Sequence, residues 1–489
     1  MTIGQMFEGI FGKHTCMTSD YHMATTFTDH NVEEVCDALH SIGFERYGKE
    51  RLYHGMYGTP IETMIYIGPV YYQRLKHLVS DKIHCLTLDH EVLTLDGWKT
   101  YHQLNNQDLV ATLQNDKLVY AKPNEMFYYP EYKGELYEVS NSNIDLKVTT
   151  NHRMYVSKPY GKKRVWKNYD FIEAKDCFGK LVKYKKDADW STADYEFTLP
   201  AITIYRNNAE IIVEEKPVDM DAFLTFLGIW VAEGWVNVNG ENLEKYKVSV
   251  SVNKQRVKDA LYPALAILGY NYSIESEKCI IKNKQLWTYM KDFSLHPSGD
   301  SLSIDLGAPN KYLPSWVFNL SVRQTRLLIQ SMILGDGSYT FSNCEIYYTS
   351  STKLADQFMQ LCLHAGWSSN ISVHLHKGNT TEIKGRKVVS NHDVLRCSVI
   401  KTKNRPSVNW RKSKVKEENI VPYEGPVFCL SVPGEVFYVR RNGKAVWTGN
   451  SRGSQGPIVN LTRQPMEGKA KDGGLRSIRP QWNKIILFC

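Results

Sequence analysis

Two stretches of short alternating strands lie far apart in this 489-residue chain. Apolar and polar residues alternate after Cys85 in CLTLDHEVLTLDGWKT and ELYEVSNSNIDLKVTTNHRMYV, and again in VFCLSVPGEVFYVRRNGKAVWTGN, which ends at Asn450. Such alternation, broken by turn residues, is typical of half-buried strands. Because short strands need partners to bury their apolar face, we expect the two stretches to close into one all-β domain around the segment between them.

The intervening segment, 219–406, has an α+β pattern with an internal repeat. FLTFLGIWVAEGW and LLIQSMILGDGSY share an apolar helical pattern with small residues in the last two turns. Each helix ends in an acidic residue followed by glycine, and the two acids are Glu233 and Asp336. A duplicated helix–strand unit is the simplest explanation.

The N-terminal flank has a different pattern. It is helical with turns from Thr2 to about Gly58, and short strands are expected around Ile61–Gly68, so we predict a mixed α/β fold there. A chain of 489 residues with 42% apolar content is too long for one ordinary core, and several domains are expected.

Composition excludes several classes. No stretch approaches a membrane span, and the N-terminal residues lack the basic start and cleavage site of a signal peptide, so we expect an intracellular protein with no membrane partner. The ten cysteines include no CxxC pair, which argues against a zinc ribbon and against a disulfide framework.

The net charge of +8 is unevenly distributed. Residues 374–416 contain twelve Lys or Arg against two acids, interleaved with apolar residues. This pattern indicates strands with a basic face that suits a phosphate backbone. A solvated charged face is an equally good interpretation of the charge alone.

The first edge of 85–450 offers groups for breaking a peptide bond. The Cys85 thiol can attack the carbonyl carbon of His84 in an N-to-S acyl shift, which turns an amide into a thioester. Because that step is uphill, a proton must reach the amide nitrogen. The sequence TTNH offers His152 as the proton donor and Thr149 to orient the nitrogen, with Asn151 a lesser candidate. A plain turn is the alternative for this motif alone.

The second edge offers groups for rejoining the chain. The Asn450 side-chain amide can attack its own backbone carbonyl, which closes a succinimide and breaks the bond to Ser451. The Ser451 hydroxyl would receive the acyl group from the Cys85 thioester, and the resulting ester would relax to an amide that joins His84 to Ser451. No cofactor is needed. An exposed turn is the alternative interpretation of this edge.

Together these blocks resemble an intein, a self-splicing element with a Hint-type horseshoe β-domain. CLTLDHEVLTLDGW is similar to the N-terminal splicing block, VTTNH to the Thr-x-x-His block, and VFCLSVPGEVFYVRRNGKAVWTGNS to the two C-terminal blocks. The resemblance covers 366 residues, from 85 to 450. It implies that the roles above belong to Cys85, Thr149, His152, Asn450 and Ser451.

The sequence departs from the intein pattern at three places. Gly449 stands where a histidine usually assists asparagine cyclisation, and the sequence PGEV lacks a histidine that the family often has there. Cys429 stands where many inteins have aspartate. We interpret Cys429 as a group that tunes the site, with internal branching as the alternative.

The repeated helices are similar to those of LAGLIDADG homing endonucleases, through FLGIWVAEG and QSMILGDG. The resemblance implies that the helices pack through small residues, and that Glu233 and Asp336 are catalytic acids that hold Mg²⁺ or Mn²⁺ for cleavage of double-stranded DNA. Buried helices that merely end in acids, or an inactive nuclease, are the alternatives. The small residues are Gly228, Ala232, Ser331 and Gly335. The predicted DNA contacts are Lys377, Lys384, Arg386, Lys387, Lys401 and Lys403.

Deleting 85–450 joins GPVYYQRLKHLVSDKIH to SRGSQGPIVNLTRQPMEGKAKDGGLR. The joined 123 residues resemble part of the second-largest, beta-type subunit of eukaryotic-type DNA-directed RNA polymerase, a nucleotidyltransferase. The resemblance implies that the partners are other polymerase subunits and the RNA–DNA hybrid. It also implies location in the nucleus, or in the cytoplasm for a viral polymerase. The predicted phosphate contacts are Arg74, Lys76, Lys82, Arg452, Arg463, Lys469 and Arg476.

The sequence therefore predicts a multi-domain protein. An all-β Hint domain, 85–218 and 407–450, is interrupted by an α+β LAGLIDADG domain, 219–406, and flanked by mixed α/β polymerase fragments, 1–84 and 451–489. Two alternatives remain. One is Hint-type cleavage without ligation, which the pair Asn450-Ser451 opposes. The other is an inert insertion, for which Gly449 is the argument.

Overall fold

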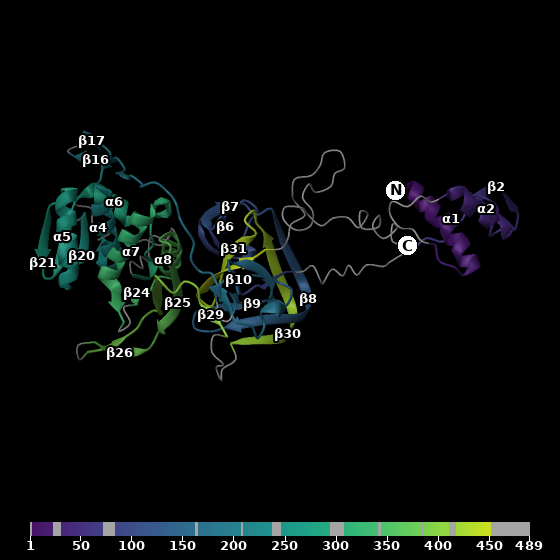
Figure 1. Ribbon diagram of the computed structural model, residues 1–489. Coiled ribbons are helices and arrows are strands. Elements are labelled where there is room, and N and C mark those ends of the chain that lie inside the picture. Colours follow the sequence, from purple (N-terminus) through teal and green to yellow (C-terminus); the bar gives the residue numbers. More distant parts are fainter. Residues whose placement is uncertain are drawn as a thin grey trace. The chain divides into compact units, whose positions relative to one another are not determined.

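The chain contains two compact units, Met1–Val79 with Gly453–Cys489, and Ser80–Arg452 (Figure 1). The computed structural model describes residues 2–22, 31–71, 84–161, 165–206, 209–236, 246–293, 308–340, 344–383, 386–409 and 417–450. Several predicted site residues lie outside these ranges. They are Arg74, Lys76, Lys82, Lys384, Ser451, Arg452, Arg463, Lys469 and Arg476.

The first unit contains two helices and a strand pair around a small core. Its elements are α1 (Thr2–Thr18), α2 (Val32–Ser41), β1 (Lys49–Tyr53) and β2 (Pro60–Tyr66). The side chain of Asn31 caps α2 by accepting a hydrogen bond from the Glu33 backbone. The helical pattern predicted up to about Gly58 is wrong for β1, which pairs antiparallel with β2. A five-residue strand depends on its partner, and the local pattern does not show that partner.

The two alternating stretches of the second unit pair with each other. Strand β30 runs antiparallel to β8 from Glu418↔Val139 to Ser431↔Glu125, and β3, β30, β8 and β9 close into a barrel. The elements of this all-β part are β3 (Leu86–Thr87), β4 (Glu91–Thr94), β5 (Gly97–Thr100), η2 (Tyr101–Gln103), β6 (Val110–Gln114), β7 (Lys117–Ala121), β8 (Glu125–Ser140), β9 (Asp145–Thr149), β10 (Arg153–Ser157), β11 (Pro159–Tyr160), β12 (Val165–Trp166), β13 (Asp170–Glu173), α3 (Ala174–Cys177), β14 (Val182–Tyr184), β29 (Ser407–Val408), β30 (Glu418–Ser431), β31 (Val436–Arg441) and β32 (Lys444–Gly449).

The intervening segment contains the predicted helix–strand repeat. The first copy is α4 (Met220–Glu233), β19 (Gly234–Val236), β20 (Lys247–Ser251), α5 (Gln255–Leu268), β21 (Tyr272–Glu275) and β22 (Lys278–Lys282). The second copy is α7 (Val322–Asp336), β23 (Gly337–Tyr339), β24 (Glu345–Thr349), α8 (Thr352–His364), β25 (Ser368–Leu375) and β28 (Val394–Ile400). Their strand orders, β19-β20-β22-β21 and β23-β24-β28-β25, are the same topology.

Shorter elements surround the two copies. They are β15 (Thr198–Leu199), β16 (Ile202–Arg206), β17 (Ala209–Val213), β18 (Lys216–Pro217), α6 (Lys284–Lys291), η4 (Ala308–Asn310), η5 (Ser315–Asn319), β26 (Thr380–Ile383) and β27 (Arg386–Val389). The stretch before α4 packs on this repeated part, since the Phe197 ring stacks on Phe223 with centroids 5.2 Å apart. No helix in the described part of the chain is long and apolar enough to cross a membrane.

One sheet continues from the repeated part into the all-β part, in the order β23-β24-β28-β25-β32-β31-β4-β6-β7. At the joint, Asn370 of β25 pairs with Lys444 of β32, and the Ile371 N–H donates to the Gly443 carbonyl at 2.8 Å. Gly443 has φ +72°, and a Cβ there would lie 2.2 Å from the Ile371 oxygen. Only glycine allows this approach of the two strands.

Lys186 is a buried cation at the same joint. Its Nζ donates to the Asn143 carbonyl at 2.8 Å and to Asn370 Oδ1. Burial, with a smaller effect of the neighbouring Lys444 ammonium, lowers the Lys186 pKa to about 7. The side chain therefore sits near the midpoint of its titration at neutral pH.

We predict that the unfolding free energy of the protein rises by about 2 kcal/mol between pH 7 and pH 9 because of Lys186. The unfolded state has the ordinary lysine pKa and binds more protons in this window, so stability increases with pH. In Lys186→Met this increase should disappear. Urea unfolding at both pH values measures it, with the exposed Lys122→Met as control. Equal pH slopes for Lys186→Met and the unchanged protein would contradict the prediction.

Candidate functional site

Cys85 and Thr149 form a two-bond clamp at the start of β3. The Cys85 N–H donates to Thr149 Oγ1 at 3.0 Å, and the Thr149 N–H donates to the Cys85 carbonyl at 3.0 Å. Both residues are fully buried. The clamp follows from strand pairing, because Leu86 of β3 lies opposite Val148 of β9. The peptide nitrogen between His84 and Cys85 is therefore held against a hydroxyl group.

His152 lies one turn beyond Thr149 and reaches the last strand. Its ring Nε2 is 2.7 Å from Thr448 Oγ1, and its Nδ1 has no hydrogen-bond partner among the described residues. Burial and then the His84 imidazole lower the His152 pKa to about 3, although the His84 backbone acts in the opposite direction. The imidazole is therefore neutral at pH 7. Asn151 contributes its carbonyl oxygen, 2.6 Å from His84 Nδ1.

Cys429 lies across the barrel strands from Cys85. The β3–β30 register pairs Leu86 with Phe428, which places Cys429 opposite Cys85. The two cysteines share a small buried cluster with Val427. Burial, and secondarily Cys429, raises the pKa of the Cys85 thiol far above its ordinary value. The thiol is therefore protonated at neutral pH and needs a base before it can attack.

Asn450 is buried at the end of β32. Its N–H donates to the Glu435 carbonyl at 2.9 Å, and its Nδ2 donates to the Val432 carbonyl at 2.9 Å. Its Oδ1 has no partner within the described ranges. Thr448, two residues earlier, is the residue that meets His152. The described residues at the two edges of 85–450 are thus connected through His152.

Gly449 and Arg153 are in direct contact. A Cβ at Gly449 would lie 2.3 Å from the Arg153 carbonyl oxygen and 3.0 Å from Phe171. The Arg153 guanidinium lies 3.9 Å from the Phe171 ring centre, and its Nη2 is 3.0 Å from Glu435 Oε2. Arg153 Nη1 is buried and has no partner among the residues described. Arg153 was not among the predicted site residues. Its position directly after His152 was the one signal for it in the sequence.

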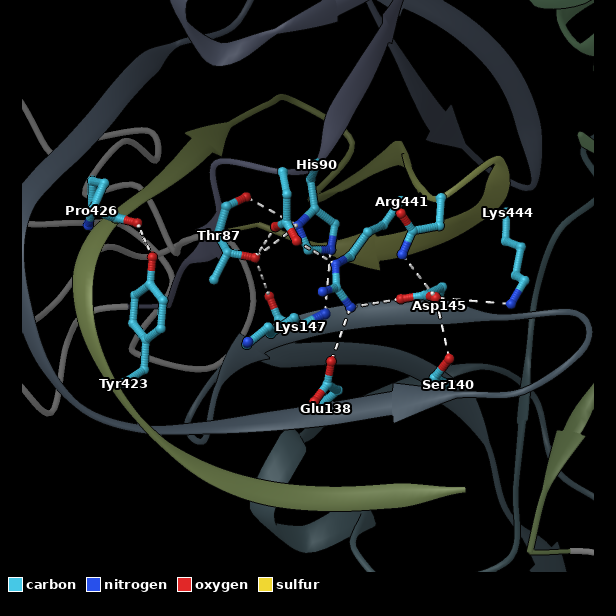
Figure 2. Close-up of polar contacts among 12 residues, drawn as sticks. Thr87, His90, Glu138, Ser140, Asp145, Lys147, Tyr423, Pro426, Arg441 and Lys444 are labelled. Atoms are coloured by element: carbon cyan, nitrogen blue, oxygen red, sulfur yellow. Dashed lines mark hydrogen bonds and ion pairs between the residues drawn. The ribbon is translucent and has the colours of Figure 1, made fainter. Parts of the chain in front are cut away.

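Arg441 ties the β31–β32 hairpin to the barrel (Figure 2). Its Nε is 2.5 Å from Asp89, and its Nη1 is 2.7 Å from Asp145 and 3.2 Å from Glu138. Lys444 Nζ adds a contact of 3.8 Å to Asp145. These acids come from β8, β9 and the turn after β3, so one side chain joins the last hairpin to the first strands. No local pattern in the sequence points to this cluster.

The second candidate site is formed where α4 and α7 pack. A Cβ at Gly228 would lie 2.6 Å from the Ser331 Cβ, and one at Gly335 would lie 2.3 Å from the Ala232 Cβ. The four small residues predicted from the repeat therefore lie at the helix–helix contact. Such close packing brings the ends of the two helices together.

A lysine ammonium lies between the two terminal acids. Lys254 Nζ is 2.5 Å from Glu233 Oε1, 3.7 Å from Asp336 Oδ1 and 2.6 Å from the Gly335 carbonyl. Burial, and then Glu233, raises the Asp336 pKa to about 6. Lys311 is buried beside them, and burial lowers its pKa to about 8 while the two acids oppose that shift. The sequence analysis identified neither lysine.

Asp336 borders a cavity of about 360 Å³ whose lining also includes Lys254, Lys311 and Tyr347. Within the described ranges, no group of three or more His, Cys, Asp or Glu side chains is arranged to hold a metal ion. The two carboxylates and the Gly335 carbonyl are the oxygen atoms that the Lys254 ammonium contacts.

The predicted DNA-contacting bases are only partly described. Lys377 and Lys403 are exposed. Lys401 Nζ is 2.7 Å from Glu345 and lies 4.6 Å from the Trp367 ring centre, so its charge already has a partner. Arg386 and Lys387 are on β27.

Residues 1–89 match the family described as RNA polymerase Rpb2, domain 6. DNA-directed RNA polymerase II subunit 2 of Arabidopsis thaliana is 50% identical over 84 residues, which is 17% of this chain and 7% of that protein. Eighty-four is also the number of residues before Cys85. The beginning of the chain is therefore similar to the second-largest subunit of RNA polymerase.

Two relatives match far more of the chain. "DNA-directed RNA polymerase subunit beta C-terminal section" of Stigeoclonium helveticum is 39% identical, over 88% of this chain and 42% of its own length. "ATP-dependent Clp protease proteolytic subunit" of Chlamydomonas moewusii is 30% identical, over 79% of this chain and 47% of its own length. The chain thus spans less than half of each relative.

The protease match must lie mainly inside 85–450. It covers 79% of this chain, or about 386 residues, whereas residues 1–84 and 451–489 together number 123. At least about 260 of the matched residues therefore belong to the segment between the flanks. Proteins named as a polymerase subunit and as a protease subunit share a similar segment.

Two solved structures also match. A class 3 split intein in a splice-inactive variant has a TM-score of 0.23 and 10% identity, over 76% of this chain and all of that one. I-DMOI in complex with its target DNA has a TM-score of 0.24 and 10% identity, over 37% of this chain and 89% of that one. Both TM-scores are well below 0.5.

Proposed function

We propose that residues 85–450 excise themselves by protein splicing and join His84 to Ser451, as an intein does. The observation that carries the proposal is the path from the Cys85 N–H to Thr149 Oγ1, and from His152 Nε2 to Thr448 Oγ1. It connects a nucleophilic thiol at one edge with a buried asparagine at the other. Splicing requires both edges in one site, whereas independent cleavages do not.

In the first step the Cys85 sulfur attacks the His84 carbonyl carbon, a C–S bond forms and the C–N bond breaks. His152 can take the thiol proton as the C–S bond forms and pass it to the leaving nitrogen. Its lowered pKa makes the imidazole a weak base but makes its protonated form a strong acid toward that nitrogen. Thr149 holds that nitrogen through the 3.0 Å hydrogen bond. The Ser451 hydroxyl then takes the acyl group from sulfur.

In the last step the Asn450 Nδ2 attacks its own carbonyl carbon, and the Ser451 nitrogen leaves with a proton. Arg153 is our candidate for the group that assists this step in place of a histidine at 449. Among the described residues, the buried Arg153 Nη1 and Asn450 Oδ1 have no hydrogen-bond partner, and both residues contact Glu435. The positive charge would favour the polarised amide.

The shared segment of the two long relatives supports splicing over an inert insertion. A segment that occurs in a polymerase subunit and in a protease subunit must leave each host functional. Self-removal satisfies this requirement without any dependence on the host. Hint-type cleavage without ligation would leave each host in two pieces.

We predict that the full chain yields a ligated product of 123 residues and an excised product of 366 residues. Cys85→Ala and Asn450→Ala should each abolish the ligated product, because each removes a reacting group. Mass spectrometry of the purified material measures both products, and Cys344→Ala is the control thiol. Separate flanks without ligation would support the cleavage alternative, and a 123-residue product from Cys85→Ala would refute the mechanism.

We predict that Arg153→Met slows asparagine cyclisation at least about tenfold, while thiol-induced cleavage at Cys85 continues. Arg153→Lys should recover part of the rate because it keeps the charge. The surface variant Lys175→Met is the control, since Lys175 is exposed and its ammonium pairs with Glu173. Wild-type rates of succinimide formation in Arg153→Met would assign the assistance to another group.

We also propose that 219–406 is a site-specific endonuclease for double-stranded DNA. The observation in its favour is the pair of acids, Glu233 and Asp336, held around a cation, the Lys254 ammonium. Carboxylate and carbonyl oxygens that accept an ammonium also suit Mg²⁺ or Mn²⁺, which would polarise phosphodiesters and water. The exposed Lys377 and Lys403 are proposed DNA contacts, together with Lys384, Arg386, Lys387 and Lys401.

We predict that the protein cleaves DNA that encodes the flanks joined without the insertion, and that Asp336→Asn lowers this cleavage at least about a hundredfold. Splicing of Asp336→Asn should be unchanged. Gel analysis of a linear target measures cleavage, with Asp259→Asn on the surface of α5 as control. Full cleavage by Asp336→Asn would exclude this acid from the site.

For the flanks we propose a role in the second-largest subunit of a DNA-directed RNA polymerase. The family match of residues 1–89 supports it. On this proposal the partners are the other polymerase subunits and the RNA–DNA hybrid. The location is then inside the cell, in the nucleus or, for a viral polymerase, in the cytoplasm.

A further inference from the structure

We infer that helix α8, which belongs to the nuclease-like repeat, is a working part of the splicing site, and that Asp356 on it is a positioning residue for Asn450. The inference rests on the splicing function proposed above. Its physical basis is that the hairpin β31–β32, which ends at Asn450, is held from one side by the barrel and from the other by α8.

Consecutive arginines hold the hairpin on its two sides. Arg441 meets acids of the barrel, whereas Arg440 is buried with 7% of its surface exposed. Arg440 Nε is 2.5 Å from Glu91 of β4, and its Nη1 donates to Asp356 of α8. Neighbouring residues of a strand point to opposite faces, which explains why the two side chains reach different domains.

Arg440 depends on Asp356 for its charge balance. The guanidinium also stacks 4.5 Å from the Trp98 ring centre, so it is enclosed by one aromatic ring and two carboxylates. Removing one partner of a buried ion pair leaves the other charge uncompensated. Loss of the Asp356 carboxylate would leave Glu91 as the one described carboxylate at the buried guanidinium, and would remove the ion pair that holds β31 against α8.

Three further side chains of α8 also contact the all-β part. Met359 and Leu363 share a buried cluster with Tyr438 of β31 and Trp447 of β32. Gln360 Nε2 donates to the Leu95 carbonyl at 3.3 Å. This helix therefore packs directly against the hairpin that positions Asn450.

His364, the last residue of α8, also contacts the all-β part. Its Nε2 is 2.7 Å from the Tyr120 hydroxyl of β7, and its ring stacks on Trp190 with centroids 4.4 Å apart. The next element, β25, continues the sheet into β32. The hairpin thus has the nuclease-like part as neighbour along its edge as well as on its face.

The two edges of 85–450 depend on this interface to different degrees. The hairpin register pairs Val436 with Gly449, and the Asn450 N–H bonds to Glu435, so a shift of β31 moves Asn450. Cys85 instead precedes β3, which pairs with β30 and β9. A disturbance of α8 should therefore affect the Asn450 reaction more strongly than thioester formation at Cys85, which β32 reaches through the contact of Thr448 with His152.

The test is Asp356→Ala in the full chain, with two reactions measured on the same sample. Ligated 123-residue product should fall at least about tenfold, because misplacing reacting groups by about 1 Å costs on the order of a hundredfold. Release of the N-terminal 84 residues by added dithiothreitol should stay within about twofold, since it needs only the Cys85 thioester. Asp356→Glu should recover part of the ligation. Asp221→Asn is the matched control, because Asp221 also pairs with an arginine, Arg323, on the surface of the repeated part.

Gln360→Met is a second variant, and it leaves no buried charge without its partner. It should also lower the amount of ligated product relative to the N-terminal 84 residues released by dithiothreitol. Unchanged ligation in Asp356→Ala, or an equal fall of ligation and thiol-induced release in both variants, would overturn the inference. Absence of ligated product from the unchanged chain would instead overturn the splicing proposal.

Discussion

The pairing of β30 with β8 is the contact on which the second unit depends. It joins stretches that are separated by the whole repeated part, and it runs from Glu418↔Val139 to Ser431↔Glu125. Every later contact between the edges of 85–450 needs this register. A slip of β30 by one residue would turn each of its side chains to the opposite face, and Cys429 would lose its place opposite Cys85.

Burial determines the chemistry of the groups at that site. The Cys85 thiol and the His152 imidazole are both uncharged at neutral pH, since desolvation raises the first pKa and lowers the second. Because transfer between these two neutral groups alone would leave a thiolate and an imidazolium in the interior, the thiol proton must move as the C–S bond forms. In the acid pair of the repeated part, by contrast, the charge of the carboxylates is compensated directly by the Lys254 ammonium.

One continuous sheet joins the repeated part to the all-β part. An inserted domain is often expected to contact its host domain through little more than the two linker segments that join them. Here β25 extends the sheet to β32, and α8 contributes Asp356 to a buried ion pair with Arg440. The domain that resembles a nuclease is therefore packed against the strands that carry the second edge of 85–450.

By itself the sequence determined the alternating stretches, the duplicated helix–strand unit and the reacting groups at the edges, because these are local patterns of period, spacing and residue type. It missed Arg153, Lys254 and Arg440, and it misassigned β1, because no local pattern shows a partner that is distant in the chain. Only the tertiary structure decided that Gly449 is pressed against Arg153 and that Arg440 and Arg441 face different parts. The physical reason is that desolvation, steric closure and ion pairing depend on what surrounds a residue in space.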